Sequence, residues 1–99
     1  MPMKSIDIDG VERNYIAYVP QGVAQLSKQN PAQLFPLLLV LHGGSGSAQQ
    51  IARGNGFLPV ADQYKFVAVF PVGFPCGKGI LDSLRCWNSG TISTTPIVD

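Results

Sequence analysis

The sequence of 99 residues predicts an α/β fold in which a β-hairpin precedes a strand–helix–strand unit. Two short runs, residues 37–41 and 66–70, are apolar at every position, which is typical of strands covered on both faces in a parallel sheet. Apolar residues between these runs recur at helical spacing, so we expect a parallel pair joined by a right-handed crossover. The length fits one domain at most, and we assign residues 1–99 to it.

The first two strands are predicted from alternation and from a turn signal. Residues 5–9 alternate polar and apolar side chains, as a half-buried strand does, and we expect this strand over residues 4–8. Asp9-Gly10 follows and is a strong hairpin pair, and residues 13–19 are rich in strand-forming side chains. We therefore expect an antiparallel hairpin, followed by a polar surface connection over residues 21–35.

The rest of the chain supplies few helices. Residues 48–53 fit a short helix, and residues 57–64 fit a second one with Pro59 in its first turn, where proline is tolerated. Residues 72–99 are rich in Gly, Pro, Ser and Thr and predict a long irregular segment. Since a sheet covered on both faces needs more helices than these, the chain is expected to be part of a larger fold that is cut short at Asp99.

Composition narrows the classes of function. With 45% hydrophobic and 13% charged residues the chain is of the globular type, and its net charge of +1 without a basic stripe argues against nucleic-acid and anionic-membrane partners. No apolar run without proline is longer than residues 37–41, which is far shorter than the roughly 20 residues of a membrane-spanning helix. No signal-peptide pattern is present, so a cytoplasmic location is expected if Met1 is the true start. The spacing of Cys76 and Cys86 fits no metal site and leaves a disulfide and two free thiols as alternatives.

The stretch LVLHGGSGSAQQ, residues 39–50, is the candidate functional segment. His42 ends the apolar run, and five of the next six residues are Gly or Ser. A phosphate cradle would aim N–H groups at an anion, but the full dinucleotide and P-loop motifs are absent. A plain strand-to-helix turn explains one or two glycines. An oxyanion loop, whose N–H groups stabilise a tetrahedral intermediate, also explains the absence of bulky side chains, and His-Gly-Gly after a strand is its context in α/β-hydrolases.

Three segments in order, PLLLVLHGGSGSA, GFLPVADQYKFVAVFPVG and CWNSG, resemble the amino-terminal part of one α/β-hydrolase family. It is the family of polyhydroxybutyrate depolymerases and feruloyl or acetylxylan esterases. The resemblance implies a serine esterase that acts on a small-molecule or polymeric ester, uses no cofactor or metal, and has its Gly-x-Ser-x-Gly nucleophile after this chain stops. It also implies that residues 66–70 lie between the hairpin and residues 37–41. The outer side of residues 37–41 is then an unpaired edge, which promotes aggregation.

The resemblance also assigns roles to individual residues. The backbone N–H of Gly44 is the first candidate for the oxyanion donor and that of Ser45 the second, the alternative being that both only turn the chain. His42 is expected to support the loop through ring hydrogen bonds, because in this fold the catalytic histidine follows the nucleophile. Trp87 and Asn88 are expected at the mouth of the active site, as a pocket wall and a brace, and ordinary packing is the alternative.

Two further expectations follow from the resemblance. Asp62 matches a family position on the helix and is interpreted as structural, and Gly44 stands where many relatives carry a cysteine, so a disulfide through that position is absent. Because these residues lack the triad, the 99-residue chain is expected to be inactive by itself. Another hydrolase of this fold (a thioesterase or peptidase), a non-catalytic binding protein and a nucleotide-binding unit remain as alternatives, and the oligomeric state is not predicted.

Overall fold

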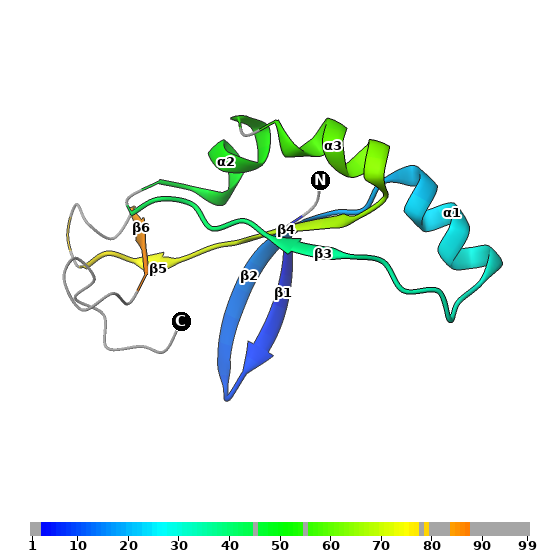
Figure 1. Ribbon diagram of the computed structural model, residues 1–99. Helices are drawn as coiled ribbons and strands as arrows, with labels where there is room; N and C mark the ends of the chain where they lie inside the picture. The colour runs from blue at the N-terminus through cyan, green and yellow to red at the C-terminus, as the bar shows by residue number, and fades with distance from the viewer. Residues whose placement is uncertain (1–2, 45, 55, 78, 80–83, 88–99) are drawn as a thin grey trace.

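The computed structural model describes residues 3–44, 46–54, 56–77, 79 and 84–87. The chain has mixed α/β content, with a four-stranded sheet, a separate two-stranded sheet and helices (Figure 1). The elements, in chain order, are β1 (Met3–Ile8), β2 (Val11–Tyr18), α1 (Gln21–Gln29), β3 (Leu37–Leu39), α2 (Ala48–Gly54), α3 (Phe57–Tyr64), β4 (Val67–Pro71), β5 (Phe74–Pro75) and β6 (Arg85–Cys86). The α/β class expected from the sequence is confirmed at this level.

The larger sheet has the strand order β1–β2–β4–β3. The hairpin strands are antiparallel, with Met3 opposite Ile16, and β2 is antiparallel to β4. β3 is parallel to β4, with Leu38 opposite Ala68. The segment from β3 through α2 and α3 to β4 is therefore a βαβ unit, and β4 lies between the hairpin and β3, as expected.

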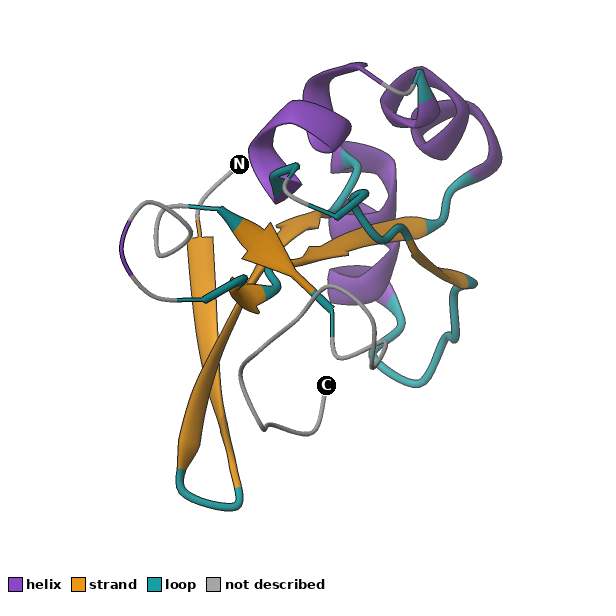
Figure 2. Cartoon of the chain, turned by 90° about the vertical axis from the view of Figure 1, so that its left-hand side faces the viewer, coloured by secondary structure: helices purple, strands orange, loops and turns teal. Residues whose placement is uncertain are grey.

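The hairpin turn takes the conformation that its sequence predicts. Asp9 and Gly10 have φ angles of 53° and 82°, and two successive positive values are the mark of a type I′ turn. The carboxylate of Asp7 accepts a hydrogen bond from the N–H of Gly10 at 2.9 Å. The end of the hairpin that carries this turn extends beyond the rest of the sheet (Figures 1 and 2).

The expected surface connection over residues 21–35 is in part a helix, α1, so that interpretation was incomplete. Val23 is buried and Leu26 is half-buried one turn later, which gives the helix a narrow apolar stripe. Its end is fixed by the N–H of Asn30, which donates to the carbonyl of Leu26 at 2.9 Å. No helix in the described part of the chain combines the length and the apolar character that crossing a membrane requires.

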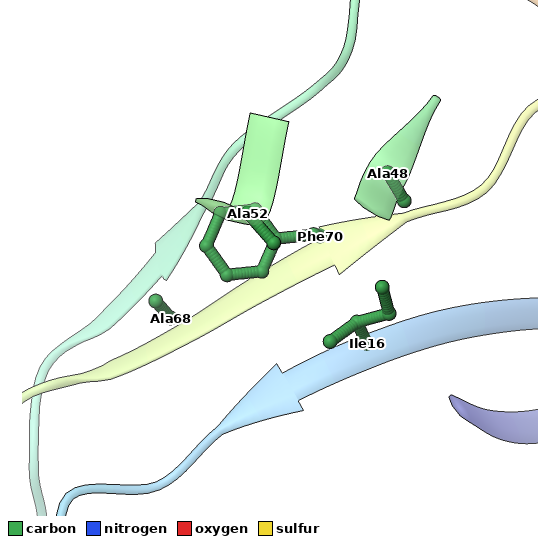
Figure 3. Packing of buried hydrophobic residues seen from close by; sticks show 5 residues of the cluster. All are labelled: Ile16, Ala48, Ala52, Ala68 and Phe70. Atoms are coloured by element: carbon green, nitrogen blue, oxygen red, sulfur yellow. The ribbon is translucent and has the colours of Figure 1, made fainter. Parts of the chain in front are cut away.

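The core lies between the larger sheet and the helices α2 and α3, which cover one of its faces (Figures 1 and 2). Three of its five members are alanines, whose small side chains let helix α2 approach β4 closely, and a phenylalanine ring fills the space beside them (Figure 3). The members, each 4% exposed or less, are Ile16, Ala48, Ala52, Ala68 and Phe70.

The other face of β3 is not covered by any described helix. Leu37, Leu39 and Leu41 are 62%, 60% and 57% exposed. The alternate residue Val40 packs against the core instead, as the two-residue period of a strand requires. β3 is the last strand in the sheet order, and no described strand pairs with its outer side. Within the part of the chain that the structure describes, the outer edge of β3 is therefore unpaired, as expected, and the expected cover on both faces is absent.

The tail expected to be irregular contains a short ordered pair. β5 and β6 are antiparallel, with Phe74 opposite Cys86, and a disulfide joins Cys76 to Cys86. The guanidinium of Arg13, from β2, lies 4.1 Å from the centre of the Phe74 ring, which connects this pair to the hairpin. The alternatives left open for the cysteines are thus decided in favour of the disulfide.

Candidate functional site

His42 occupies a buried position just after β3. Its side chain is 3% exposed, and both of its ring nitrogens are hydrogen-bonded. Nδ1 lies 2.8 Å from the carbonyl oxygen of Gly43, and the N–H of Gly73 donates to Nε2 over 3.0 Å. Since a carbonyl only accepts and an amide N–H only donates, the ring is neutral with its hydrogen on Nδ1. A ring held in this way has no free nitrogen with which to take a proton from a nucleophile.

The carbonyl of Gly43 is fixed by two donors. It accepts from Nδ1 of His42 and from the N–H of Gly46, the latter at 2.9 Å, which closes a tight turn over residues 43–46. A Cβ atom at Gly46 would lie 3.1 Å from that carbonyl oxygen, so the turn favours glycine there. Because the trans peptide is planar, the N–H of Gly44 points opposite to the Gly43 carbonyl.

Two amides of this turn, those of Gly43 and Gly44, belong to exposed residues. Within the described residues neither N–H donates a hydrogen bond. The amide of Gly46 is already used inside the turn. The loop thus presents two neighbouring N–H groups that have no acceptor among the described residues, an arrangement that can bind an oxygen atom carrying negative charge.

Ser47 has a structural role at the start of α2. Its hydroxyl oxygen accepts a hydrogen bond from the N–H of Gln50 at 3.1 Å, which is the pattern of a helix N-cap. This contact explains one of the two serines of the loop by its structural role alone.

A hollow of about 280 Å³ lies beside the turn and is lined in part by His42, Gly43 and Gln50.

Trp87 contacts His42 from the far end of the described chain. Its Nε1–H donates to the carbonyl oxygen of His42 at 2.7 Å, and the two rings lie 4.8 Å apart between centroids at an interplanar angle of 34°. Trp87 also lines an apolar hollow of about 480 Å³ on the helix-free face of the sheet, together with Leu41 and Val72. Trp87 therefore lines this hollow and also contacts the loop directly.

Gly73 is a residue of the site that sequence reasoning missed. It is buried, and a Cβ atom placed on it would overlap the carbonyl oxygen of Cys86 and lie 3.1 Å from the nitrogen of that residue. Only glycine therefore lets the chain just before β5 approach Cys86 of β6 this closely while the Gly73 N–H reaches His42. Its position inside a stretch already rich in Gly and Pro gave no signal.

The other predicted residues lie away from the loop or outside the described part. Ser45 and Asn88 fall outside the described residues. Asp62 lies on α3, where its carboxylate accepts a hydrogen bond from the hydroxyl of Tyr18 at 2.6 Å. This hydrogen bond, with smaller effects of burial and of the Asp62 charge, raises the pKa of Tyr18 above its usual value of 10.0. Asp62 thus ties α3 to the end of β2, away from the turn.

No model of a known protein family matches the chain, and a search of curated proteins finds no match either. Within the described residues, no three His, Cys, Asp or Glu side chains gather into a group that could hold a metal ion. Any functional assignment therefore rests on the geometry of the turn and on the resemblance of its sequence.

Proposed function

We propose that this chain carries the oxyanion loop of a serine carboxylic-ester hydrolase of the α/β-hydrolase fold. The enzymes that it resembles are the polyhydroxybutyrate depolymerases and the feruloyl or acetylxylan esterases. The observation that carries the proposal is the peptide between Gly43 and Gly44. Its carbonyl is held by two donors, so its N–H is aimed outward from a residue without a side chain.

The chemistry assigned to this N–H is electrostatic. In ester hydrolysis a serine oxygen attacks the carbonyl carbon, and the carbonyl oxygen becomes an anion. A preorganised backbone donor stabilises that anion, and losing one such donor costs about 2.7–4 kcal/mol in the transition state. Gly44 would supply this donor, and the absence of a Cβ lets the ester approach the backbone closely.

The remaining catalytic groups would come from outside these residues. His42 is the only histidine of the sequence, and both of its ring nitrogens are hydrogen-bonded, so this histidine cannot serve as the general base. The proposal therefore requires a Gly-x-Ser-x-Gly segment and a second histidine elsewhere in the complete enzyme. The exposed outer side of β3 is where the strand leading to that serine would pair in this fold.

The disulfide bears on where such an enzyme would work. Disulfides persist in oxidising compartments and are rare in the cytosol. The bond between Cys76 and Cys86 therefore favours a secreted or periplasmic enzyme over the cytoplasmic location expected from the sequence.

The test begins with the coding frame after residue 99, which should continue into a Gly-x-Ser-x-Gly segment. In the complete protein, the N–H of Gly44 is removed by replacing the amide with a backbone ester, which leaves the side-chain-free geometry intact. We expect kcat for a p-nitrophenyl ester to fall about 10²–10³-fold with little change in KM. Gly22→Ala on α1 is a suitable control, because the new methyl group would meet only Cε of Lys65 at 3.6 Å. A frame without the serine segment, or an unchanged kcat, would refute the proposal.

A further inference from the structure

The carbonyl of His42 is held from outside the loop, by the indole N–H of Trp87 at 2.7 Å. The peptide that joins His42 to Gly43 is planar and trans, so the N–H of Gly43 points opposite to that carbonyl. By holding this carbonyl, Trp87 fixes the direction of the Gly43 N–H. In the same way, Nδ1 of His42 and the N–H of Gly46 hold the Gly43 carbonyl and so fix the direction of the Gly44 N–H. Two successive peptides are each fixed through their carbonyl oxygens.

The disulfide lies next to Trp87 in the sequence. Trp87 follows Cys86 directly, and Gly73, whose N–H holds the other side of the His42 ring, precedes β5 directly. These two residues are 45 and 31 positions away from His42 in the sequence. β5 and β6 are strands of only two residues each, so the covalent link between Cys76 and Cys86 is the strongest restraint that keeps them together.

We propose that Trp87 is a positioning residue that fixes the direction of the Gly43 N–H, and that the Cys76–Cys86 disulfide keeps Trp87 in place for this task. The loop then presents the Gly43 and Gly44 amides together as a rigid pair of donors. The significance of this pair for catalysis depends on the proposed esterase function. The positioning itself does not, because it can be measured in the 99-residue chain without any reaction.

The first experiment removes the indole donor and keeps an aromatic ring, with Trp87→Phe in the oxidised chain. Residual dipolar couplings and ¹⁵N relaxation report the direction and order of each N–H vector. We expect the order parameter of Gly43 to fall from the rigid value of about 0.85 to below about 0.6, while Gly44 keeps its order. Tyr64→Phe is the matched control, because it also alters an aromatic side chain but is 67% exposed on α3.

The second experiment opens the disulfide with dithiothreitol. This dithiol gives two electrons and two protons to the Cys76–Cys86 bond, forms two thiols there, and closes to its own cyclic disulfide. We expect the Gly43 amide to lose order as it does in Trp87→Phe. The fluorescence of Trp87, the only tryptophan of the sequence, should change in parallel. In a chain with Cys76→Ser and Cys86→Ser together, dithiothreitol should have no effect.

The outcomes separate the two parts of the proposal. An unchanged Gly43 vector in Trp87→Phe would overturn the positioning role, as would an equal loss of order at Gly43 and Gly44. An unchanged vector after reduction would overturn the role of the disulfide. A reduced chain that loses all dispersed resonances would also contradict that second part, because the bond would then hold the whole fold, and Trp87→Phe would still decide the first part. Failure of the esterase assay changes none of these results.

Discussion

Replacing Leu39 by lysine should raise the solubility of the chain markedly while costing little stability. Leu37 and Leu39 of the edge strand β3, and Leu41 just after it, are each about 60% exposed. Since full burial of a leucine contributes roughly 1.5–3 kcal/mol, covering all three by another molecule would contribute about 3–5 kcal/mol. One lysine in the middle of this face removes at least a third of that association free energy, about 1–2 kcal/mol. It also adds a charge that opposes strand pairing.

The assay is the concentration at which static light scattering departs from that of a monomer. A loss of about 1–2 kcal/mol corresponds to a 5–30-fold higher threshold concentration. The substitution should lower the free energy of unfolding by only about 0.6–1.2 kcal/mol in a urea titration, because only the smaller part of the Leu39 side chain is buried. Leu34→Lys is the matched control, since Leu34 is 92% exposed in the segment before β3. Equal thresholds for the two variants would refute the reasoning, because charge alone would then explain the effect.

Three other substitutions test the core, the site and the α3 contact. Phe70→Ala should lower the free energy of unfolding by about 3–5 kcal/mol in urea titrations, because the ring is fully buried, and a loss under 1 kcal/mol would contradict the packing. Gly73→Ala should cost about 1–3 kcal/mol and shift the ring ¹⁵N resonances of His42, since the new methyl overlaps the Cys86 carbonyl. The hydrogen bond to Asp62 raises the pKa of Tyr18, so the contribution of this bond to the stability of the fold is full below about pH 10 and is lost as the pH rises further. In urea titrations at about pH 8, the chain should be more stable than Tyr18→Phe, by less than about 1 kcal/mol at this exposed site. At about pH 11 the two should be equally stable. A difference at both pH values would contradict the assignment.

Local chemistry explains which elements the sequence predicts well. Asp9 and Gly10 tolerate positive φ, so the turn follows directly from their side chains. The helical spacing in residues 57–64 likewise reappears as α3. The strand order, in contrast, was expected from the family resemblance, because pairing between distant strands has no signature in either strand alone.

Elements with few apolar residues were the ones missed. Helix α1 buries a single residue, Val23, so its apolar pattern does not stand out from that of a polar connection. β5 and β6 are too short for any alternation to be visible, and the disulfide that joins them was only one of two alternatives. Their pairing depends on a covalent bond and on the close approach at Gly73, neither of which propensity describes.

The oxyanion site stays a prediction, and the sequence pointed to the loop after β3 but not to the residues that contact it. The bare residues after β3 pointed to exposed amides, and His42 with its buried ring was singled out from sequence. The contacts of His42 with Gly73 and Trp87 bridge 31 and 45 residues of sequence. Such contacts arise from tertiary structure, and a single sequence contains no measure of them.

The alanines that pack helix α2 against the sheet set the distance between the start of this helix and the sheet. Helix α2 begins at Ala48, two residues after Gly46, and Ala48 and Ala52 are in full contact with the layer beneath. A larger side chain at Ala48 would press against that layer and displace the first turn of the helix, together with Gly46 just before it. In the proposed esterase, the position of the oxyanion loop would therefore depend on the size of a residue beneath the helix that the substrate does not touch.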